Sequence, residues 1–183
     1  QGTNDIALNN CGRLQAEKLA NRLLQSEKID DIYTSDLKRA SETANIIGEK
    51  LNINPIADPL IREVSFGLWE GLSIDEIESV YPGELLKWRK QLDFAPMGGE
   101  SLLSAYERVN NFLDKLILGE NKDKRLLIIS HAATIKIIIL IIMGAPLEKI
   151  TSIRIDQTAL SLLKIDKGRE QLIYMNDSQH LLK

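Results

Sequence analysis

Two residues suited to anion binding follow predicted strands. Arg39 comes about one turn into a predicted helix, shortly after the extended segment 31–34, and His131 directly follows the apolar run 125–130. The free N–H groups at a helix N-terminus attract anions, and an arginine fork or an imidazole can donate hydrogen bonds to the same anion. An exposed surface arginine and a structural histidine stay open as the alternatives. The other histidine, His180, has no such setting.

The loop 60–72 contains groups suited to proton transfer. It holds Glu63 and Glu70 together with two glycines and Trp69. A carboxylic acid held against apolar and aromatic neighbours has a raised pKa, so it can donate a proton near neutral pH. The spacing alone does not decide which of the two glutamates does so.

The composition argues against several classes of protein. The 183 residues carry 23 Lys and Arg against 26 Asp and Glu, whereas a protein that binds nucleic-acid phosphates normally has a basic excess. Two dispersed histidines and one cysteine give no zinc-ligand spacing, and no glycine-rich nucleotide fingerprint occurs. We therefore expect no cofactor, no metal and no nucleic-acid partner.

The cellular setting follows from two features of the sequence. A single cysteine fits a reducing compartment, so we expect a cytoplasmic protein. The most apolar segment, 135–143, is too short to span a bilayer and predicts a buried helix, so no membrane partner is expected. The oligomeric state is left open, with a homodimer as one alternative.

Strand and helix patterns alternate along the chain, which predicts an α/β fold. Apolar spacing predicts helices near 16–24, at 37–51 with Ser35 or Asp36 as N-cap, and over most of 73–118. The predicted strands are 31–34, 54–59, 125–130, 150–155, 159–165 and 171–175. We expect one domain over 1–183: a three-layer sandwich whose mainly parallel central sheet has helices on both faces, with a small helical cap at 73–103. Chemistry in such folds lies beyond the carboxyl ends of the strands.

Five short motifs occur in order along the chain. They are Gln1-Gly2 with the segment 8–16, the segments 33–44 (YTSDLKRASETA) and 60–71 (LIREVSFGLWEG), Gly98-Gly99-Glu100-Ser101, and Ser130-His131. Together they resemble the histidine phosphatase superfamily, the phosphoglycerate-mutase-like proteins. The likeness is greatest to small phosphatases such as α-ribazole phosphatase, and it runs through nearly all of the chain.

The resemblance implies a function and a set of site residues. A metal-independent phosphatase would act on a small phosphomonoester, with α-ribazole phosphate as one candidate, through a phosphohistidine. Glu63 would be the general acid, while Arg39, His131 and the Ala132 amide would bind the phosphoryl oxygens. Gln1 and Gly2 would also contact the substrate. Glu70 would have a structural role.

One family motif has no match in the printed residues. The Arg-His-Gly triplet that supplies the nucleophilic histidine belongs upstream of Gln1, and neither His131 nor His180 is followed by glycine. We therefore expect that the chain as printed lacks an N-terminal strand and is inactive without it. Ala132-Ala133 replaces the usual Gly-Gly, an exchange that keeps the backbone N–H donor.

Two other functions stay open: a phosphoglycerate mutase and a non-catalytic phosphate-binding module. The stretch between Trp69 and His131 is too short for the insertion that mutases carry, and the charge run 87–90 is typical of a solvated helix face. Three apolar residues of the cap segment could either line a slot for the leaving group or pack beneath the cap, and packing is favoured: Trp88, Phe94 and Met97.

Overall fold

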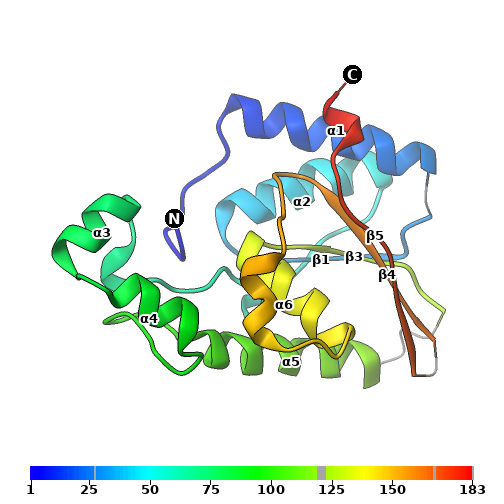
Figure 1. Ribbon diagram of the computed structural model, residues 1–183. Helices are drawn as coiled ribbons and strands as arrows, with labels where there is room; N and C mark the ends of the chain where they lie inside the picture. Colours follow the sequence, from blue (N-terminus) through cyan, green and yellow to red (C-terminus); the bar gives the residue numbers. More distant parts are fainter. Residues whose placement is uncertain (27, 119–122, 167, 183) are drawn as a thin grey trace.

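A three-stranded parallel sheet forms the centre of the protein (Figure 1). The computed structural model describes residues 1–26, 28–118, 123–166 and 168–182. The sheet order is β2-β1-β3, with β1 spanning Asp31–Thr34, β2 Ile56–Ala57 and β3 Leu126–Ile129. Thr34 pairs with Ile129, so β1 and β3 end at the same edge of the sheet. Arg39 and His131 follow these strand ends.

Helices cover both faces of this sheet, as the alternating pattern predicts (Figure 1). On one face lie α1 (Asn10–Ser26) and α2 (Lys38–Leu51), and on the other lie α5 (Leu102–Leu118) and α6 (Ala132–Ile142). Successive side chains of a strand point to opposite faces. Leu126 and Ile128 therefore pack against the α5–α6 core, whereas Leu127 and Ile129 pack against the α1–α2 core. The phosphoglycerate-mutase-like three-layer fold is confirmed.

The most apolar segment of the chain forms a core helix. Within α6 the buried side chains include Ile137, Ile138, Ile139 and Leu140. No helix in the described part of the chain has the length and apolar character needed to cross a membrane.

The C-terminal part differs from its prediction in one element. The predicted strand 150–155 is wrong, because Leu147–Ser152 forms a 3₁₀ helix that buries Leu147 and Ile150 on one side. Residues three apart share a face in a 3₁₀ turn, and here that face packs into the α5–α6 core. The other two predicted strands form an antiparallel hairpin of β4 (Leu160–Asp166) and β5 (Arg169–Asp177).

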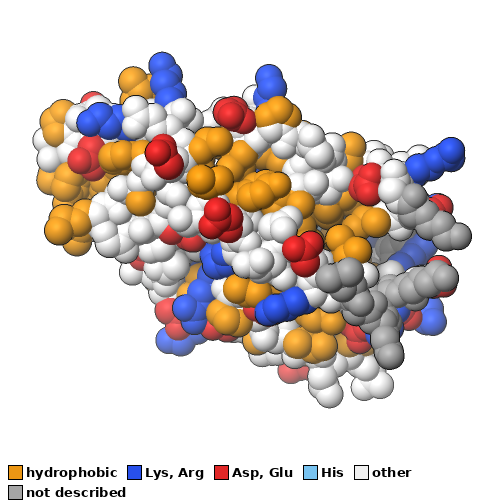
Figure 2. Space-filling view, turned by 90° about the horizontal axis from the view of Figure 1, so that it is seen from below, with side chains coloured by type: hydrophobic (Ala, Val, Ile, Leu, Met, Phe, Trp, Pro, Cys, Tyr) orange, Lys and Arg blue, Asp and Glu red, His pale blue; other side chains and the backbone are white. Residues whose placement is uncertain are grey.

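The helical cap is shorter than predicted. It consists of α3 (Ile74–Val80), which begins with a capping box from Ser73 and Glu76, and α4 (Glu84–Lys90). Residues 91–101 form turns rather than helix. Of α3 and α4 only Ile77 is buried, and Figure 2 shows hydrophobic side chains exposed at the end of the molecule where these helices lie.

Strand β3 has a free edge in the described part of the chain. It pairs with β1 on one side, and no described strand pairs with it on the other. Its four apolar residues are only half-buried, although both faces are covered by helices. An unpaired edge of an apolar strand is a template for another strand.

Candidate active site

His131 lies buried where β3 passes into α6. Its Nε2 is 2.9 Å from the Oγ of Ser35, which follows the neighbouring strand β1 and is itself fully buried. Burial, together with the positive charges of Arg39 and Arg108, lowers the pKa of His131 to about 3. The ring is therefore neutral at physiological pH.

The neutral ring makes the stability of the fold depend on pH. The unfolded chain takes up a proton on His131 near pH 6.5, whereas the folded chain does so only near pH 3, so acid favours unfolding across this window. We expect the free energy of unfolding to fall by about 2 kcal/mol between about pH 6.5 and pH 5 through this group. Urea unfolding of the wild type and of His131→Gln at several pH values measures this fall in the free energy of unfolding. The variant should lack the part due to His131, and an identical pH dependence in both proteins would contradict the lowered pKa of His131.

Arg39 is half-buried and holds the N-terminal loop. Its Nη1 donates to the carbonyl of Asn4 and its Nη2 to the carbonyl of Gly2, both at 2.7 Å. Burial lowers its pKa, against the opposing influence of Glu63 and of nearby carboxylates. Asp36 and Glu42 lie near Arg39 in the sequence, but neither pairs with it. Asp36 binds Arg62, and Glu42 binds Arg13. The alternative of a surface arginine is therefore wrong.

Glu70 joins the N-terminal loop to the turn at 66–70. Its Oε1 accepts hydrogen bonds from the amide and the hydroxyl of Thr3 at 2.8 and 2.9 Å, and from the Phe66 amide at 3.1 Å. Burial alone would raise the pKa of Glu70, but these donors hold it below its usual value. Gly2 has φ +49°, and a Cβ there would lie 2.2 Å from Glu70 Oε1, so this position needs glycine.

The Glu63 carboxylate lies at the N-terminus of α6, directly beyond His131. Its Oε2 accepts from the Ala133 amide and its Oε1 from the Thr134 amide, each at 3.3 Å, and Oε1 also accepts from the Val64 amide at 3.0 Å. The first turn of α6 thus offers its amides to a protein carboxylate through Ala133 and Thr134. The predicted contact of the Ala132 amide with a phosphoryl oxygen stays a prediction.

A cavity of about 290 Å³ opens beside Glu63. Two of the loops around it approach closely: a Cβ on Gly67 would lie 2.2 Å from the Met97 carbonyl, and the Glu100 amide donates to the Ser65 carbonyl. The cavity is lined by Thr3, Pro59, Arg62, Glu63, Ser65, Gly98, Gly99, Glu100 and Arg108. Arg39, His131, Ala132, Gln1 and Gly2 are not part of this lining, although Arg39 holds the carbonyls on both sides of Thr3.

Trp88 and Met97, two of the three apolar residues of the cap segment, differ in burial. Trp88 packs edge-on against Phe66, with ring centroids 5.3 Å apart, and belongs to the border of the core. Met97 is 75% exposed. Packing is therefore correct for Trp88, and the structure gives Met97 no such role.

Several polar residues of the site were not predicted. Ser35 and Asp36 do not cap α2, whose N-cap is Leu37, because Ser35 contacts His131 and Asp36 binds Arg62. Arg108 carries no signal in the sequence, since it stands on a helix outside every motif. Among the described residues, no three His, Cys, Asp or Glu side chains are grouped so that they could hold a metal ion.

The sequence and the fold are similar to those of known proteins. Residues 1–178 match the family model of the histidine phosphatase superfamily, branch 1. Phosphoserine phosphatase 1 of Hydrogenobacter thermophilus is 31% identical over 99% of this chain and 85% of its own length. A mycobacterial glucosyl-3-phosphoglycerate phosphatase solved with VO3 is 26% identical and superimposes with a TM-score of 0.87 over 97% of this chain and 90% of that one.

A third relative concerns the predicted likeness to α-ribazole phosphatases. The Shigella flexneri enzyme of that name has a TM-score of 0.86 over 97% of this chain and 88% of its own, at 24% identity, which shows a shared fold. The likeness is thus one among several. The Arg-His-Gly segment upstream of Gln1 stays a prediction. From its motifs, its fold and these matches, the chain belongs to the histidine phosphatase superfamily, branch 1.

Proposed function

We propose that this protein is a metal-independent phosphomonoesterase that acts through a phosphohistidine on a small phosphorylated metabolite. The observation that supports it most is the position of His131 and Glu63 at the carboxyl edge of the sheet, where β3 passes into α6. Glu63 accepts from the helix that His131 precedes, and the charge of Arg39 acts on both of these groups. Two of the five N–H groups of Arg39 bond to the Asn4 and Gly2 carbonyls, which leaves others for an anion beside a carboxyl group suited to proton transfer.

Each residue has a distinct role in the proposed reaction. The attacking imidazole nitrogen forms a bond to phosphorus while the bond to the leaving oxygen breaks, and Glu63 gives that oxygen its proton. In the second step the Glu63 carboxylate takes a proton from water, which attacks phosphorus and frees inorganic phosphate and the histidine. Arg39 and His131 stabilise the charge on the phosphoryl oxygens.

The proposed nucleophile is the histidine of an Arg-His-Gly segment on a strand added to β3. In the described part of the chain, the remaining histidine, His180, is near Arg22 and Thr158 and lies against α1. A strand that paired in parallel with the free edge of β3 would end beside His131, because parallel strands end at one edge of a sheet. The edge therefore suits a nucleophile that attacks a phosphate held by His131 and Arg39.

This proposal gives a direct expectation for the printed chain. The purified and folded 183 residues should release no phosphate from p-nitrophenyl phosphate, because neither of their histidines is the proposed nucleophile. The protein that includes the Arg-His-Gly segment should turn the ester over. Turnover by the 183 residues alone, measured as p-nitrophenolate release, would contradict the proposed nucleophile.

The substrate class is best tested with a panel of phosphomonoesters. The relatives are named for phosphoserine, glucosyl-3-phosphoglycerate and α-ribazole phosphate, three different leaving groups. We propose that the substrate is a small phosphorylated metabolite, with α-ribazole phosphate among the candidates. Phosphate release by the full-length protein from sugar, nucleoside and carboxylic-acid phosphates, with α-ribazole phosphate in the panel, should identify it by the highest kcat/KM.

A mutase and a non-catalytic module are the competing functions. The cavity is open to solvent beside a short cap, and such a site admits the water that a mutase must exclude. Interconversion of 2- and 3-phosphoglycerate faster than phosphate release would favour the mutase. Phosphate binding without any turnover by the full-length protein would favour the module.

A further inference from the structure

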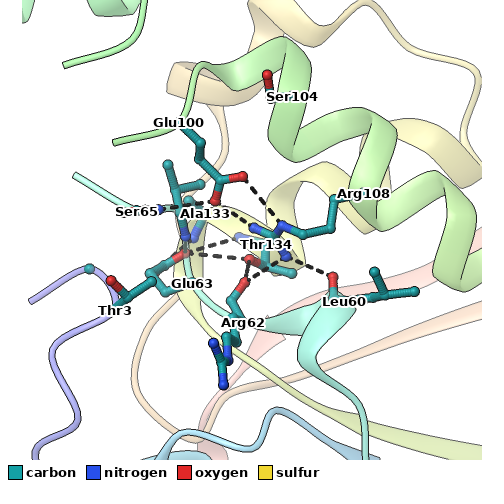
Figure 3. A network of polar contacts seen from close by, with 12 residues as sticks. Thr3, Leu60, Arg62, Glu63, Ser65, Glu100, Ser104, Arg108, Ala133 and Thr134 are labelled. Carbon is teal, nitrogen blue, oxygen red and sulfur yellow. Dashed lines mark hydrogen bonds and ion pairs between the residues drawn. The ribbon is translucent and has the colours of Figure 1, made fainter. Parts of the chain in front are cut away.

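Arg108 lies on α5 and reaches the backbone just before Glu63. Its Nη1 donates to the carbonyl of Leu60 at 2.7 Å and to the carbonyl of Arg62 at 3.1 Å (Figure 3). The second of these carbonyls belongs to the residue that precedes Glu63 in the chain. One guanidinium from a separate helix thus fixes the backbone on the N-terminal side of the proposed acid.

Glu100 extends this contact to the other side of Glu63. Its Oε1 accepts from Arg108 Nη2 at 2.7 Å and from the Ser65 amide at 3.0 Å, and its Oε2 accepts from Arg108 Nε at 3.3 Å. The ion pair is therefore a bidentate fork, and both side chains are only 20% exposed, which makes it stronger than a surface pair. The pair therefore binds the backbone before Glu63 through Arg108 and after Glu63 through Glu100.

The backbone at Glu63 is held more tightly than its carboxylate. Thr134 Oγ1 donates to the Arg62 carbonyl at 2.6 Å, and Ser130 Oγ donates to the Ile61 carbonyl at 2.7 Å. The Glu63 carboxylate, by contrast, meets its nearest donor, the Val64 amide, at 3.0 Å and the α6 amides at 3.3 Å. A proton donor needs this arrangement, because its base must be fixed while its carboxyl group remains able to reach the leaving oxygen.

The donors of Arg108 are largely occupied by these protein groups. Its contacts with Leu60, Arg62 and Glu100 use four N–H groups, and a guanidinium has five. Arg108 lines the cavity, but a phosphate there would compete with two carbonyls and a carboxylate for it. Its geometry fits support of the loop better than binding of the substrate.

We propose that Arg108, paired with Glu100, is a positioning residue that aims Glu63 at the leaving oxygen. The inference rests on the proposed function, in which Glu63 is the general acid. A residue that acts only through the acid should matter most for substrates whose leaving group needs a proton. Alkyl phosphates need it, and aryl esters such as p-nitrophenyl phosphate hardly do.

The test measures kcat and KM of the full-length protein for a series of esters with leaving groups of increasing pKa. Arg108→Lys and Arg108→Ala should lower kcat for alkyl phosphates by about 10- to 100-fold, the usual effect of a misplaced catalytic group. The kcat for p-nitrophenyl phosphate and the KM values should change little. Arg89→Ala, which removes an exposed arginine of α4, is the control and should behave as the wild type.

A second comparison separates positioning from general structural support. In a Glu63→Gln background, Arg108→Ala should cause no further loss of kcat for alkyl phosphates, because the two residues act as one unit. Added guanidinium should partly restore alkyl ester turnover to Arg108→Ala. If Arg108→Ala fails to fold, Arg108→Lys carries the test.

The outcomes that overturn this inference differ from those that overturn the proposed function. Equal losses for all leaving groups in the Arg108 variants, a raised KM, or additive losses with Glu63→Gln would overturn the positioning role alone. A Glu63→Gln variant without any leaving-group dependence would overturn the general acid and the positioning role together.

Discussion

Replacing Glu63 by glutamine should slow the hydrolysis of alkyl phosphates by roughly 10²–10⁴-fold, which is the usual contribution of a positioned general acid. The amide keeps the size of the side chain but has no proton to give to an alkoxide. The loss should be much smaller for p-nitrophenyl phosphate, because nitrophenolate leaves without protonation. The slope of log kcat against the leaving-group pKa in both proteins measures the effect.

Glu70→Gln is the matched control for this experiment. Glu70 stands in the same loop, but its Oε1 is occupied by Thr3 and Phe66. Its loss should loosen the N-terminal loop and lower the rates for all esters alike. A leaving-group trend that follows Glu70 rather than Glu63 would show that the acid has been assigned to the wrong carboxylate.

Replacing Arg39 by alanine should cost about 2–5 kcal/mol of transition-state stabilisation, a loss of roughly 30- to 4,000-fold in kcat/KM. The change removes a half-buried charge that lies close to His131 and Glu63. Lysine should restore only part of the rate, because a point charge cannot reproduce the fork that holds two oxygens at once. Steady-state kinetics with p-nitrophenyl phosphate would measure both variants.

Arg39 also holds the N-terminal loop, so this prediction needs a control for loop position. Asp5 tethers the same loop through the Lys38 amide and side chain, and it is exposed. Asp5→Ala should change kcat/KM by less than about 3-fold, as expected for an exposed pair. Equal losses in Asp5→Ala and Arg39→Ala would mean that Arg39 acts through the loop and not on the phosphate.

The strand ends and the residues that follow them could be predicted from the sequence. An apolar run indicates a parallel strand with both faces covered, and the residue after it lies at the edge of the sheet where ligands bind. His131 stands at such a position, and Ser35, for which the sequence predicts only an N-cap role, lies within hydrogen-bond distance of it. This contact depends on the pairing of β1 with β3, two strands that lie far apart in the chain.

The loop supports could not be predicted. Arg108 stands on α5, whose apolar spacing indicates only which face is buried, so nothing local links it to Leu60. The prediction of a strand at 150–155 is wrong for a related reason. The isoleucines and threonine of this segment favour a strand locally, but burying Leu147 and Ile150 against the α5–α6 core favours a 3₁₀ helix. In both places tertiary packing decides the outcome.

The most direct test of the account is to look for the phosphoenzyme in the absence of metal. The full-length protein, treated with excess EDTA and mixed with a phosphomonoester, should keep its turnover. Rapid quenching should trap phosphate on the protein in a linkage that is stable in alkali and labile in acid, as expected for phosphohistidine. Loss of turnover on chelation, or protein-bound phosphate that survives acid, would contradict a metal-independent phosphohistidine mechanism.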